Sequence, residues 1–180
     1  PLASDLKIVS LNKLIEISIR TFKNLKTKII FEHYYGGKCF IECNQFEIVQ
    51  VLLNLFKNSM ESYNISGTET ENRVVVVRTY VDRENLDQGK FVIASVEDFS
   101  NGISESDISK IWNQGFTTKE VDDVNIVRGQ GLFIVKEIIN KHLNSNIKVE
   151  SPITKPNGSV ISGTKFIISF PQKEVELINQ

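Results

Sequence analysis

Apolar residues recur at helical spacing along two long segments of the chain. In residues 11–26, leucine, isoleucine and phenylalanine repeat every three or four positions, and Ser10 precedes them as a candidate N-cap. In residues 45–63, an apolar stripe predicts a second, longer helix. The residues of this stripe that we expect to be buried are Phe46, Val49, Leu53, Phe56 and Met60. Further helices are predicted over residues 105–113 and 129–142.

Runs rich in β-branched and aromatic residues predict strands between these helices. The predicted strands cover residues 27–35, 38–42, 73–83, 90–97, 146–151 and 163–170. Gly36-Gly37 turns the chain between the first two strands, and a charged connection joins 73–83 to 90–97 as a hairpin. Because helices alternate with several mostly antiparallel strands, we predict an α+β fold, a two-layer α/β sandwich.

Composition and charge narrow the class of protein. The chain has 180 residues, of which 41% are hydrophobic, enough for the core of one domain. Its formal net charge of −1 argues against a nucleic-acid binder that works through bulk positive charge. No apolar run approaches the roughly 20 residues of a membrane helix, and no signal peptide is visible after Pro1. We therefore expect a soluble, cytoplasmic chain.

The two cysteines, Cys39 and Cys43, lie four residues apart in a predicted strand and the turn after it. An extended chain would hold their Cα atoms about 13 Å apart, beyond the reach of a disulfide. Reduced thiols are therefore expected.

The predicted helix over residues 45–63 carries two asparagines on one face. Asn54, Asn58 and Glu61 are spaced i, i+4 and i+7, and Lys57 stands beside them. Carboxamide oxygens are suitable ligands for Mg²⁺, which prefers oxygen and keeps several waters. A solvated helix face explains the same residues, so this motif alone leaves both readings open.

A second motif follows the strand over residues 90–97. Asp98 ends the strand and leads into a turn of small residues that includes Gly102. A carboxylate in this position is able to accept a hydrogen bond from an exocyclic amine such as that of adenine. An ordinary Asp-Asn-Gly turn is the alternative.

A third motif, Arg128-Gly129-Gln130-Gly131, opens the helix over residues 129–142. Backbone N–H groups at a helix start form an anion site that suits a phosphate chain, and Arg128 adds a charge-assisted contact. The preceding residues 111–119 combine aromatic, glycine, hydroxyl and lysine side chains, which is typical of a mobile cover over a bound phosphate. A helix start without a ligand and an ordinary surface loop remain the alternatives.

In their order and spacing these motifs resemble the ATP-binding catalytic domain of two-component sensor histidine kinases. This domain belongs to the wider superfamily of type II topoisomerases, heat-shock chaperones and mismatch-repair ATPases. The resemblance covers residues 11–171 and implies a Bergerat-type fold, a mixed sheet with helices on one face and a mobile ATP lid. It leaves 1–10 as the remnant of a linker and 172–180 as a C-terminal tail, and it allows the chain to be the cytoplasmic part of a membrane-bound sensor.

The resemblance also implies roles for individual residues and the cofactors ATP and Mg²⁺. Asn58 corresponds to the asparagine that coordinates Mg²⁺, Asp98 to the aspartate that recognises the adenine amino group, and Thr164 to a threonine that helps bind adenine. The implied catalytic residues are Asn54 and Lys57. The implied nucleotide-binding residues are Asn58, Asp98, Gly102, Ile103, Thr118, Lys119, Arg128, Gly129, Gly131, Leu132 and Thr164.

Three residues depart from the family pattern. Ser100 stands in place of the first glycine after the aspartate, so we expect this turn to differ in its backbone angles. Trp112 stands where phenylalanine is usual, and Val127 stands where a first glycine of the second glycine box is usual. None of the three removes Asn58 or Asp98, so nucleotide binding is expected to survive.

The phosphoacceptor histidine of this family is missing. It usually lies in His-Glu-x-x-Pro, and neither His33 nor His142 has that context. The resemblance therefore implies phosphoryl transfer from ATP to a histidine on a separate dimerisation and phosphoacceptor domain, with a response regulator as an indirect partner. In isolation we expect a monomer.

Two alternatives remain, one within the superfamily and one from another class of protein. A hydrolytic ATPase that works as a conformational clamp places a glutamate four residues before the metal-binding asparagine, where this chain has Asn54. A carboxamide is a poor general base, which disfavours hydrolysis. A nucleotide-binding regulator that transfers no phosphate remains open.

Overall fold

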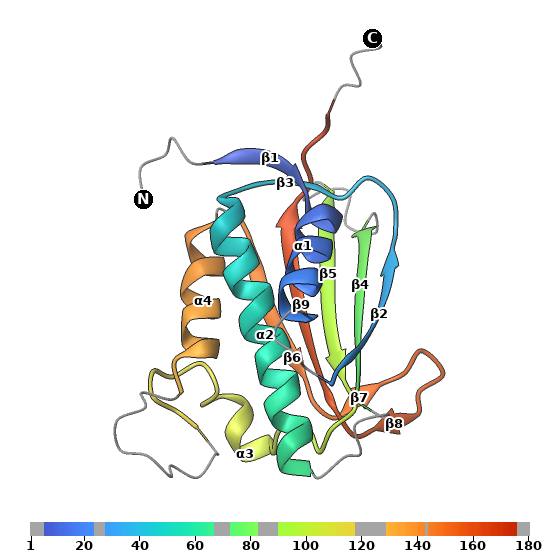
Figure 1. Ribbon diagram of the computed structural model, residues 1–180, viewed down its shortest axis with the longest axis vertical. Coiled ribbons are helices and arrows are strands. Elements are labelled where there is room, and N and C mark those ends of the chain that lie inside the picture. Colours follow the sequence, from blue (N-terminus) through green and yellow to red (C-terminus); the bar gives the residue numbers. More distant parts are fainter. Residues whose placement is uncertain are drawn as a thin grey trace.

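The computed structural model describes residues 6–23, 28–66, 73–82, 90–117, 129–142 and 144–175. The strands are β1 Lys7–Ser10, β2 Ile30–Tyr35, β3 Phe40–Cys43, β4 Val74–Asp82, β5 Phe91–Asp98, β6 Asn146–Glu150, β7 Ile153–Thr154, β8 Val160–Ile161 and β9 Thr164–Pro171. The helices are α1 Leu11–Lys23, α2 Gln45–Ser66, α3 Glu105–Ile108 and α4 Gly131–Lys141 (Figure 1). Among the described helices, none is both long enough and apolar enough to cross a bilayer.

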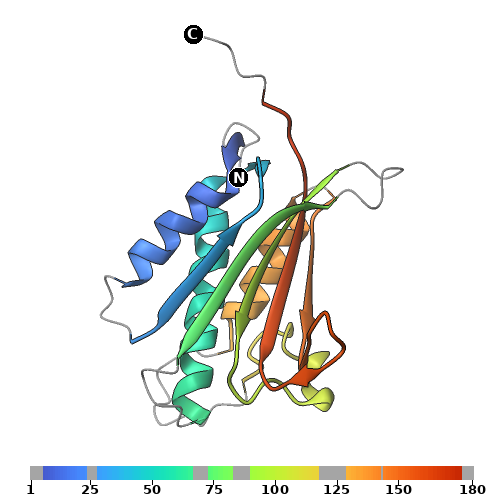
Figure 2. The same cartoon turned by 90° about the vertical axis from the view of Figure 1, so that its right-hand side faces the viewer.

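The main sheet has five strands in the order β2-β4-β5-β9-β6. β2 and β4 are parallel, whereas the β4–β5, β5–β9 and β9–β6 pairs are antiparallel. Helices α1, α2 and α4 cover one face of this sheet (Figure 2). The predicted α+β sandwich, with a mixed sheet and its helices on one face, is therefore confirmed, and so is the hairpin of β4 and β5.

The pairing of the first strands differs from the local pattern along the chain. β2 and β3 follow one another across Gly36-Gly37 but do not pair with each other. β2 pairs with β4, which lies beyond α2, and β3 pairs with the unpredicted strand β1. A parallel partner is separated by a long crossover, so it cannot be read from neighbouring residues. β1 falls within residues 1–10, whose origin as a linker remnant stays a prediction.

The buried face of α2 is wider than predicted. Phe46, in the first turn, is 76% exposed, so its assignment to the buried stripe is wrong. Phe56 is buried as predicted, whereas Val49, Leu53 and Met60 are only partly buried. The fully buried positions are Ile48, Val51, Leu52, Leu55, Phe56, Ser59 and Tyr63. The reason is that α2 lies between α1 and α4 as well as against the sheet, so more than one stripe is covered.

Aromatic side chains join the helix layer to the sheet near its β2 edge. Phe22 of α1, Phe31 of β2 and Phe56 of α2 make mutual edge-to-face contacts, with ring centroids 4.8 to 5.9 Å apart. Cys39 and Cys43 are buried in the core and are free thiols, in agreement with the prediction.

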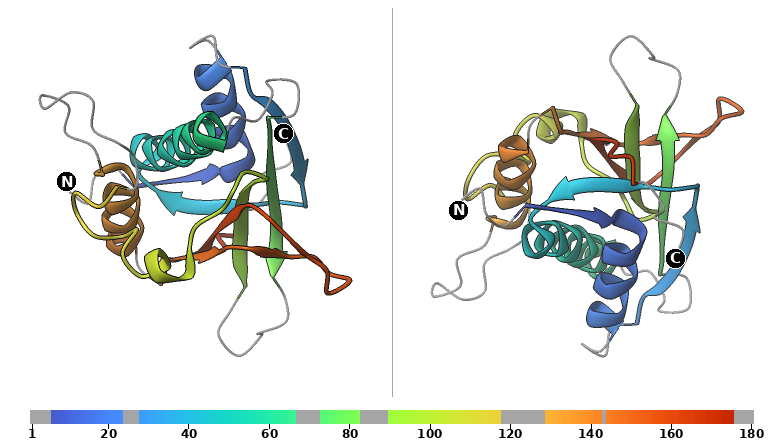
Figure 3. Two further views of the ribbon diagram at one scale, coloured as in Figure 1. Left: turned by 90° about the horizontal axis from the view of Figure 1, so that it is seen from below. Right: turned by 90° about the horizontal axis from the view of Figure 1, so that it is seen from above.

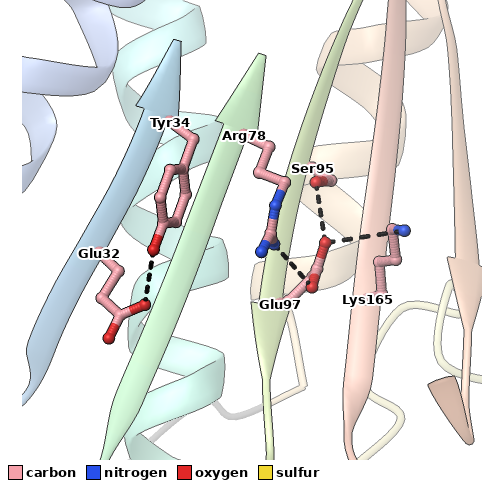
Figure 4. Close-up of polar contacts among 6 residues, drawn as sticks. All are labelled: Glu32, Tyr34, Arg78, Ser95, Glu97 and Lys165. Atoms are coloured by element: carbon pink, nitrogen blue, oxygen red, sulfur yellow. Dashed lines mark hydrogen bonds and ion pairs between the residues drawn. The ribbon is translucent and has the colours of Figure 1, made fainter. Parts of the chain in front are cut away.

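The other face of the sheet carries a polar network that spans neighbouring strands (Figure 4). The Glu97 carboxylate of β5 pairs with Arg78 of β4 at 3.0 Å and with Lys165 of β9 at 3.6 Å, and it accepts a hydrogen bond from Ser95 at 3.2 Å. The Arg78 guanidinium also lies 5.1 Å from the centroid of the Tyr34 ring. These long side chains cover Glu97, which is only 7% exposed. The face of the sheet that the helices leave uncovered is thus covered here by paired charged side chains.

Candidate functional site

The predicted site residues come from segments that meet at one end of the sandwich. The C-terminal end of α2, the end of β5, the start of α4 and the start of β9 all lie at the lower end of Figure 1, and the left panel of Figure 3 looks onto this end. Asp98 of β5 is paired directly with Thr164 of β9, and both residues are buried. The order of motifs along the chain therefore becomes a single cluster in space.

The Asp98 carboxylate is the most enclosed charged group of this cluster, at 1% exposed. Its Oδ2 accepts a hydrogen bond from the Ser59 hydroxyl of α2 at 3.0 Å. Its Oδ1 accepts one from the Ser100 hydroxyl at 2.6 Å and a second from the Ser100 backbone N–H at 3.2 Å. These donors come from the helix layer and from the loop after β5, so the carboxylate joins the two.

Burial raises the pKa of Asp98 above its ordinary value of 3.8. Hydrogen bonds from the Ser100 side chain, the Ser100 backbone, the Ser59 hydroxyl and the Thr164 backbone act in the opposite direction, because they stabilise the charged form. The net shift is upward, so the desolvation of the carboxylate is only partly offset. A charged acceptor in such an environment binds an external N–H donor more strongly than it would in water.

The loop after β5 approaches the start of β9 through two glycines. Gly102 has φ of 78°, and a Cβ there would lie 2.7 Å from the Ser151 Oγ and 2.9 Å from the Gly163 carbonyl oxygen. Gly163 has φ of 138°, and a Cβ there would overlap the Asp98 carbonyl oxygen. Only glycine allows both close approaches. The predicted residue Ile103 follows directly and packs partly buried against the core.

Two residues that sequence reasoning missed hold this loop. The Ser151 hydroxyl donates to the Gly163 carbonyl at 2.7 Å and accepts from the Ile103 N–H at 2.8 Å. The buried Tyr63 hydroxyl of α2 donates to the Val74 carbonyl at 2.6 Å and accepts from the Phe99 N–H at 2.8 Å. No short motif marks either residue, because each acts on backbone groups far away in the chain.

Asn54 lies beside the start of α4. A Cβ on Gly131 would be 3.8 Å from the Asn54 Oδ1. The Asn54 Nδ2 is buried and has no hydrogen-bond partner within the part of the chain that the structure describes. The first turn of α4 is also left without a side-chain cap, since Gln130 at the N-cap makes no such bond. An unpartnered buried N–H donor next to an uncapped helix start fits an anionic ligand. The predicted residue Leu132 packs partly buried behind this point.

Asn58 and Lys57 are placed differently from each other on α2. Asn58 is half-buried, and its carboxamide makes no hydrogen bond within the described residues, so its oxygen is available to a ligand. Lys57 is exposed, and its Nζ lies 3.8 Å from the Glu61 carboxylate one turn later. In the described ranges, no three His, Cys, Asp or Glu side chains gather as metal ligands. A cation held here would depend on carboxamide oxygen and on oxygens of a bound ligand.

The segment between α3 and α4 is anchored at both of its described ends. The Trp112 ring packs edge-on against Phe166 of β9, with centroids 6.0 Å apart. Gly115 donates its backbone N–H to the Gly129 carbonyl at 3.1 Å, and a Cβ on Gly129 would lie 2.5 Å from the Gly115 carbonyl carbon. Three predicted binding residues, Thr118, Lys119 and Arg128, and with them much of the predicted lid, lie outside the described residues.

Comparison with known families gives one matching sequence profile. The family described as Histidine kinase-, DNA gyrase B-, and HSP90-like ATPase matches residues 43–174. This range contains every predicted site residue.

The curated relatives and solved structures that are similar to this chain include kinases. Sporulation kinase A of Bacillus subtilis (strain 168) is 32% identical over 168 residues, which are 92% of this chain but 24% of that protein. The chain thus spans about a quarter of its length. The catalytic domain of the histidine kinase ThkA superimposes with a TM-score of 0.65 at 25% identity, covering 93% of this chain and 95% of that one. A mycobacterial sensor histidine kinase, MprB, has the same fold, with a TM-score of 0.68 at 16% identity, covering 94% and 99%.

Removing the Tyr63 hydroxyl should destabilise the chain. In Tyr63→Phe the Phe99 N–H and the Val74 carbonyl lose their shared partner, and we expect the free energy of unfolding to fall by about 1–3 kcal/mol. Urea unfolding followed by the fluorescence of the single tryptophan, Trp112, measures this. Tyr34→Phe is the control, because Tyr34 is exposed and its hydroxyl bonds Glu32 alone among the described residues, and a change within about 0.5 kcal/mol is expected. Equal small losses in both variants would contradict the role of Tyr63.

The buried Asp98 should make the nucleotide-free chain less stable as pH rises. Because the pKa of Asp98 is raised on folding, the folded state binds more protons than the unfolded state above pH 3.8, and stability falls as pH rises through the folded pKa. We therefore expect Asp98→Asn to be more stable than the wild type at pH 8, with the difference shrinking toward pH 4. Urea unfolding at several pH values measures it.

Asp107 provides the control of opposite sign. Hydrogen bonds from Ser104 and Lys110 lower its pKa, so its charged form stabilises the fold above pH 3.8 and this contribution is lost as pH falls. Asp107→Asn should not gain stability at pH 8. If the difference in unfolding free energy between Asp98→Asn and the wild type did not change with pH, the charged form of Asp98 would not destabilise the fold.

Proposed function

The chain belongs to the family of histidine kinase-, DNA gyrase B- and HSP90-like ATPases, and we propose that it binds ATP with Mg²⁺ and transfers the γ-phosphoryl group to a histidine on a separate domain. It is the ATP-binding catalytic domain of a sensor histidine kinase in two-component signalling. Since it spans only a fraction of its relatives' length, the transfer reaction and its partners are part of the proposal.

Asp98 reads the adenine base in this proposal. Its ionised carboxylate only accepts hydrogen bonds, so it favours the 6-amino group of adenine over the 6-oxo group of guanine. The less occupied oxygen, Oδ2, takes the amino group, and Thr164 lines the same end of the site. Because Asp98 is almost fully covered, side chains above it move aside as the base enters. This buried and incompletely compensated carboxylate is the single observation that carries the proposal.

The phosphates lie toward the start of α4. The Asn54 Nδ2, which has no partner among the described residues, and the backbone N–H groups near Gly129 and Gly131, at a helix start without a side-chain cap from Gln130, donate to phosphate oxygens there. Thr118, Lys119 and Arg128 add donors and positive charge from the segment before α4, and Lys57 adds charge from α2 by leaving Glu61. Gly102, Ile103 and Leu132 shape the backbone and apolar walls around the nucleotide.

Asn58 is the protein's own ligand for Mg²⁺. Its carboxamide is half-buried, unpartnered within the described residues and on the same helix face as Asn54. When bound, the ion neutralises phosphate charge. The chain's contribution to transfer is then positioning and electrostatic stabilisation, with no covalent step on its own side chains.

The acceptor is a histidine on the dimerisation and phosphoacceptor domain of the same kinase, and a response regulator receives the phosphoryl group afterwards. We propose that the isolated chain is a monomer, that it lies in the cytoplasm and that it contacts no nucleic acid. Hydrolysis is disfavoured because Asn54, which occupies the position of the water-activating glutamate in the clamp ATPases, does not take up a proton near neutral pH.

A labelling experiment separates the three candidate activities. The chain is mixed with γ-labelled ATP, Mg²⁺ and the phosphoacceptor hairpin of the same kinase. We expect label on the hairpin that is stable in base and labile in acid, as a phosphohistidine is. Release of inorganic phosphate without a labelled hairpin would favour the clamp ATPase, and binding without either product would favour the regulator.

Substituting Asn58 should weaken nucleotide binding only when Mg²⁺ is present. By calorimetry, Asn58→Ala should lower the ADP affinity in Mg²⁺ by at least roughly tenfold, the lower end of what losing support of a metal costs. Its affinity in EDTA should match the wild type. Asn64→Ala is the control on the same helix, because Asn64 is exposed and its Oδ1 only accepts from Arg73. A loss of equal size with and without Mg²⁺ would remove Asn58 as the metal ligand.

A further inference from the structure

Ser100 occupies a turn position where the family usually has glycine, yet its backbone does not need glycine. Among the described residues other than glycine, only Asn144 has a positive φ, so Ser100 lies in an ordinary backbone region. The expectation that this turn differs from the family's in its backbone angles stays a prediction. The side chain is 3% exposed and donates its hydroxyl to the Asp98 Oδ1 at 2.6 Å. The substitution thus adds a buried donor to the carboxylate.

A second serine completes a chain of hydroxyl groups. The Ser62 Oγ of α2 lies 2.6 Å from the Ser100 Oγ. Each serine hydroxyl has one hydrogen to donate. Because the Ser100 hydrogen points to the Asp98 carboxylate, Ser62 must donate to Ser100. Since each hydroxyl donates one hydrogen, Ser62 donates to Ser100 and Ser100 donates to Asp98. Each of these hydrogen bonds polarises the next.

The hydrogen bonds of these hydroxyl groups decide which oxygen of the Asp98 carboxylate remains available to a ligand. A carboxylate oxygen accepts about two hydrogen bonds. Oδ1 receives both the Ser100 hydroxyl and the Ser100 N–H, whereas Oδ2 receives the Ser59 hydroxyl. Ser100 thus fills Oδ1 and turns it toward the protein, and Oδ2, whose side-chain donor among the described residues is Ser59, is left as the acceptor for a ligand.

We propose that Ser62 and Ser100 form a hydroxyl relay that fixes the orientation of the Asp98 carboxylate and thereby sets the discrimination between 6-amino and 6-oxo purine nucleotides. This inference rests on the proposed function, because it needs Asp98 to read the base. Both serines are positioning residues that act through Asp98. Without the Ser100 hydroxyl, Oδ1 loses a charge-assisted bond, and without Ser62 that bond loses the donor that polarises it. The carboxylate is then held less firmly and more readily takes up a proton that it donates to a 6-oxo group.

The protein provides a matched control in Ser162, which lies between β8 and β9 and contacts the same loop. The Ser162 hydroxyl donates to the Ser100 carbonyl at 2.7 Å, so it anchors the same residue without belonging to the relay. A purely structural role of Ser100 predicts that Ser162→Ala and Ser62→Ala behave alike. The relay predicts that they differ.

The test compares the affinities of ADP and inosine diphosphate, whose base carries a 6-oxo group, by calorimetry in Mg²⁺. The ratio of the two affinities should fall about fivefold in Ser100→Ala, which removes one hydrogen bond to the Asp98 carboxylate. It should fall in the same direction, but by less, in Ser62→Ala, which removes only the donor that polarises the Ser100 hydroxyl. Ser62→Thr keeps a hydroxyl and should retain the wild-type ratio, and Ser162→Ala should retain it as well. Thermal unfolding of each nucleotide-free variant identifies those that are folded.

The outcomes separate this inference from the proposed function. If the wild type binds neither nucleotide, the proposed function itself fails. If the wild type prefers ADP and both alanine variants keep that preference, the relay is overturned and the proposed function stands. An equal fall in Ser162→Ala, or no rescue by Ser62→Thr, would also overturn the relay. Ser62→Ala lies on α2, outside the loop, so it tests the relay even if Ser100→Ala does not fold.

Discussion

The burial of one carboxylate at the junction of the two layers organises this domain. Asp98 ends β5, is paired in register with the start of β9 and receives hydrogen bonds from α2 and from its own loop. A desolvated charge is costly unless donors surround it, so these segments are held in fixed positions relative to one another. In the proposed function, the stability lost to this burial is recovered when the nucleotide donates to the remaining acceptor site, so nucleotide binding and folding are coupled.

Around this carboxylate, glycine stands where no Cβ fits and serine stands where a side chain has room. At Gly163 and Gly102 the backbones of the β5 loop and the β9 start approach so closely that no Cβ fits. At Ser100 there is room for a side chain, and its hydroxyl is used to hold the charge. In this chain the motif after β5 therefore combines glycine positions that the backbone restricts with a serine position that supplies a hydrogen-bond donor.

The open face of the sheet is independent of this site. Its central carboxylate, Glu97, is one residue before Asp98 but points to the opposite side and is paired with Arg78 and Lys165. Because successive side chains of a strand point to opposite faces of the sheet, the neighbouring acids Glu97 and Asp98 of β5 lie in different surroundings. Glu97 is held by cations in a surface network, and Asp98 is held by neutral donors in the interior.

Much of this protein could be predicted from local patterns. Helix and strand periodicity located α1, α2, α4 and the β4–β5 hairpin, because these depend on neighbouring residues. The spacing of the motifs identified Asn54, Asn58, Asp98, Gly131 and Thr164 as candidates, and the fold brings Asp98 to Thr164 and Asn54 to Gly131.

Other features were decided only by tertiary structure. The parallel pairing of β2 with β4, the pairing of β1 with β3 and the orientation of α2 depend on which distant segments pack together. So do the contacts of Tyr63, Ser151 and Ser62, each of which acts on a group more than ten residues away. The hydrogen-bond partner of a serine cannot be predicted from the sequence, because it depends on distances between residues that exist only after the chain has folded.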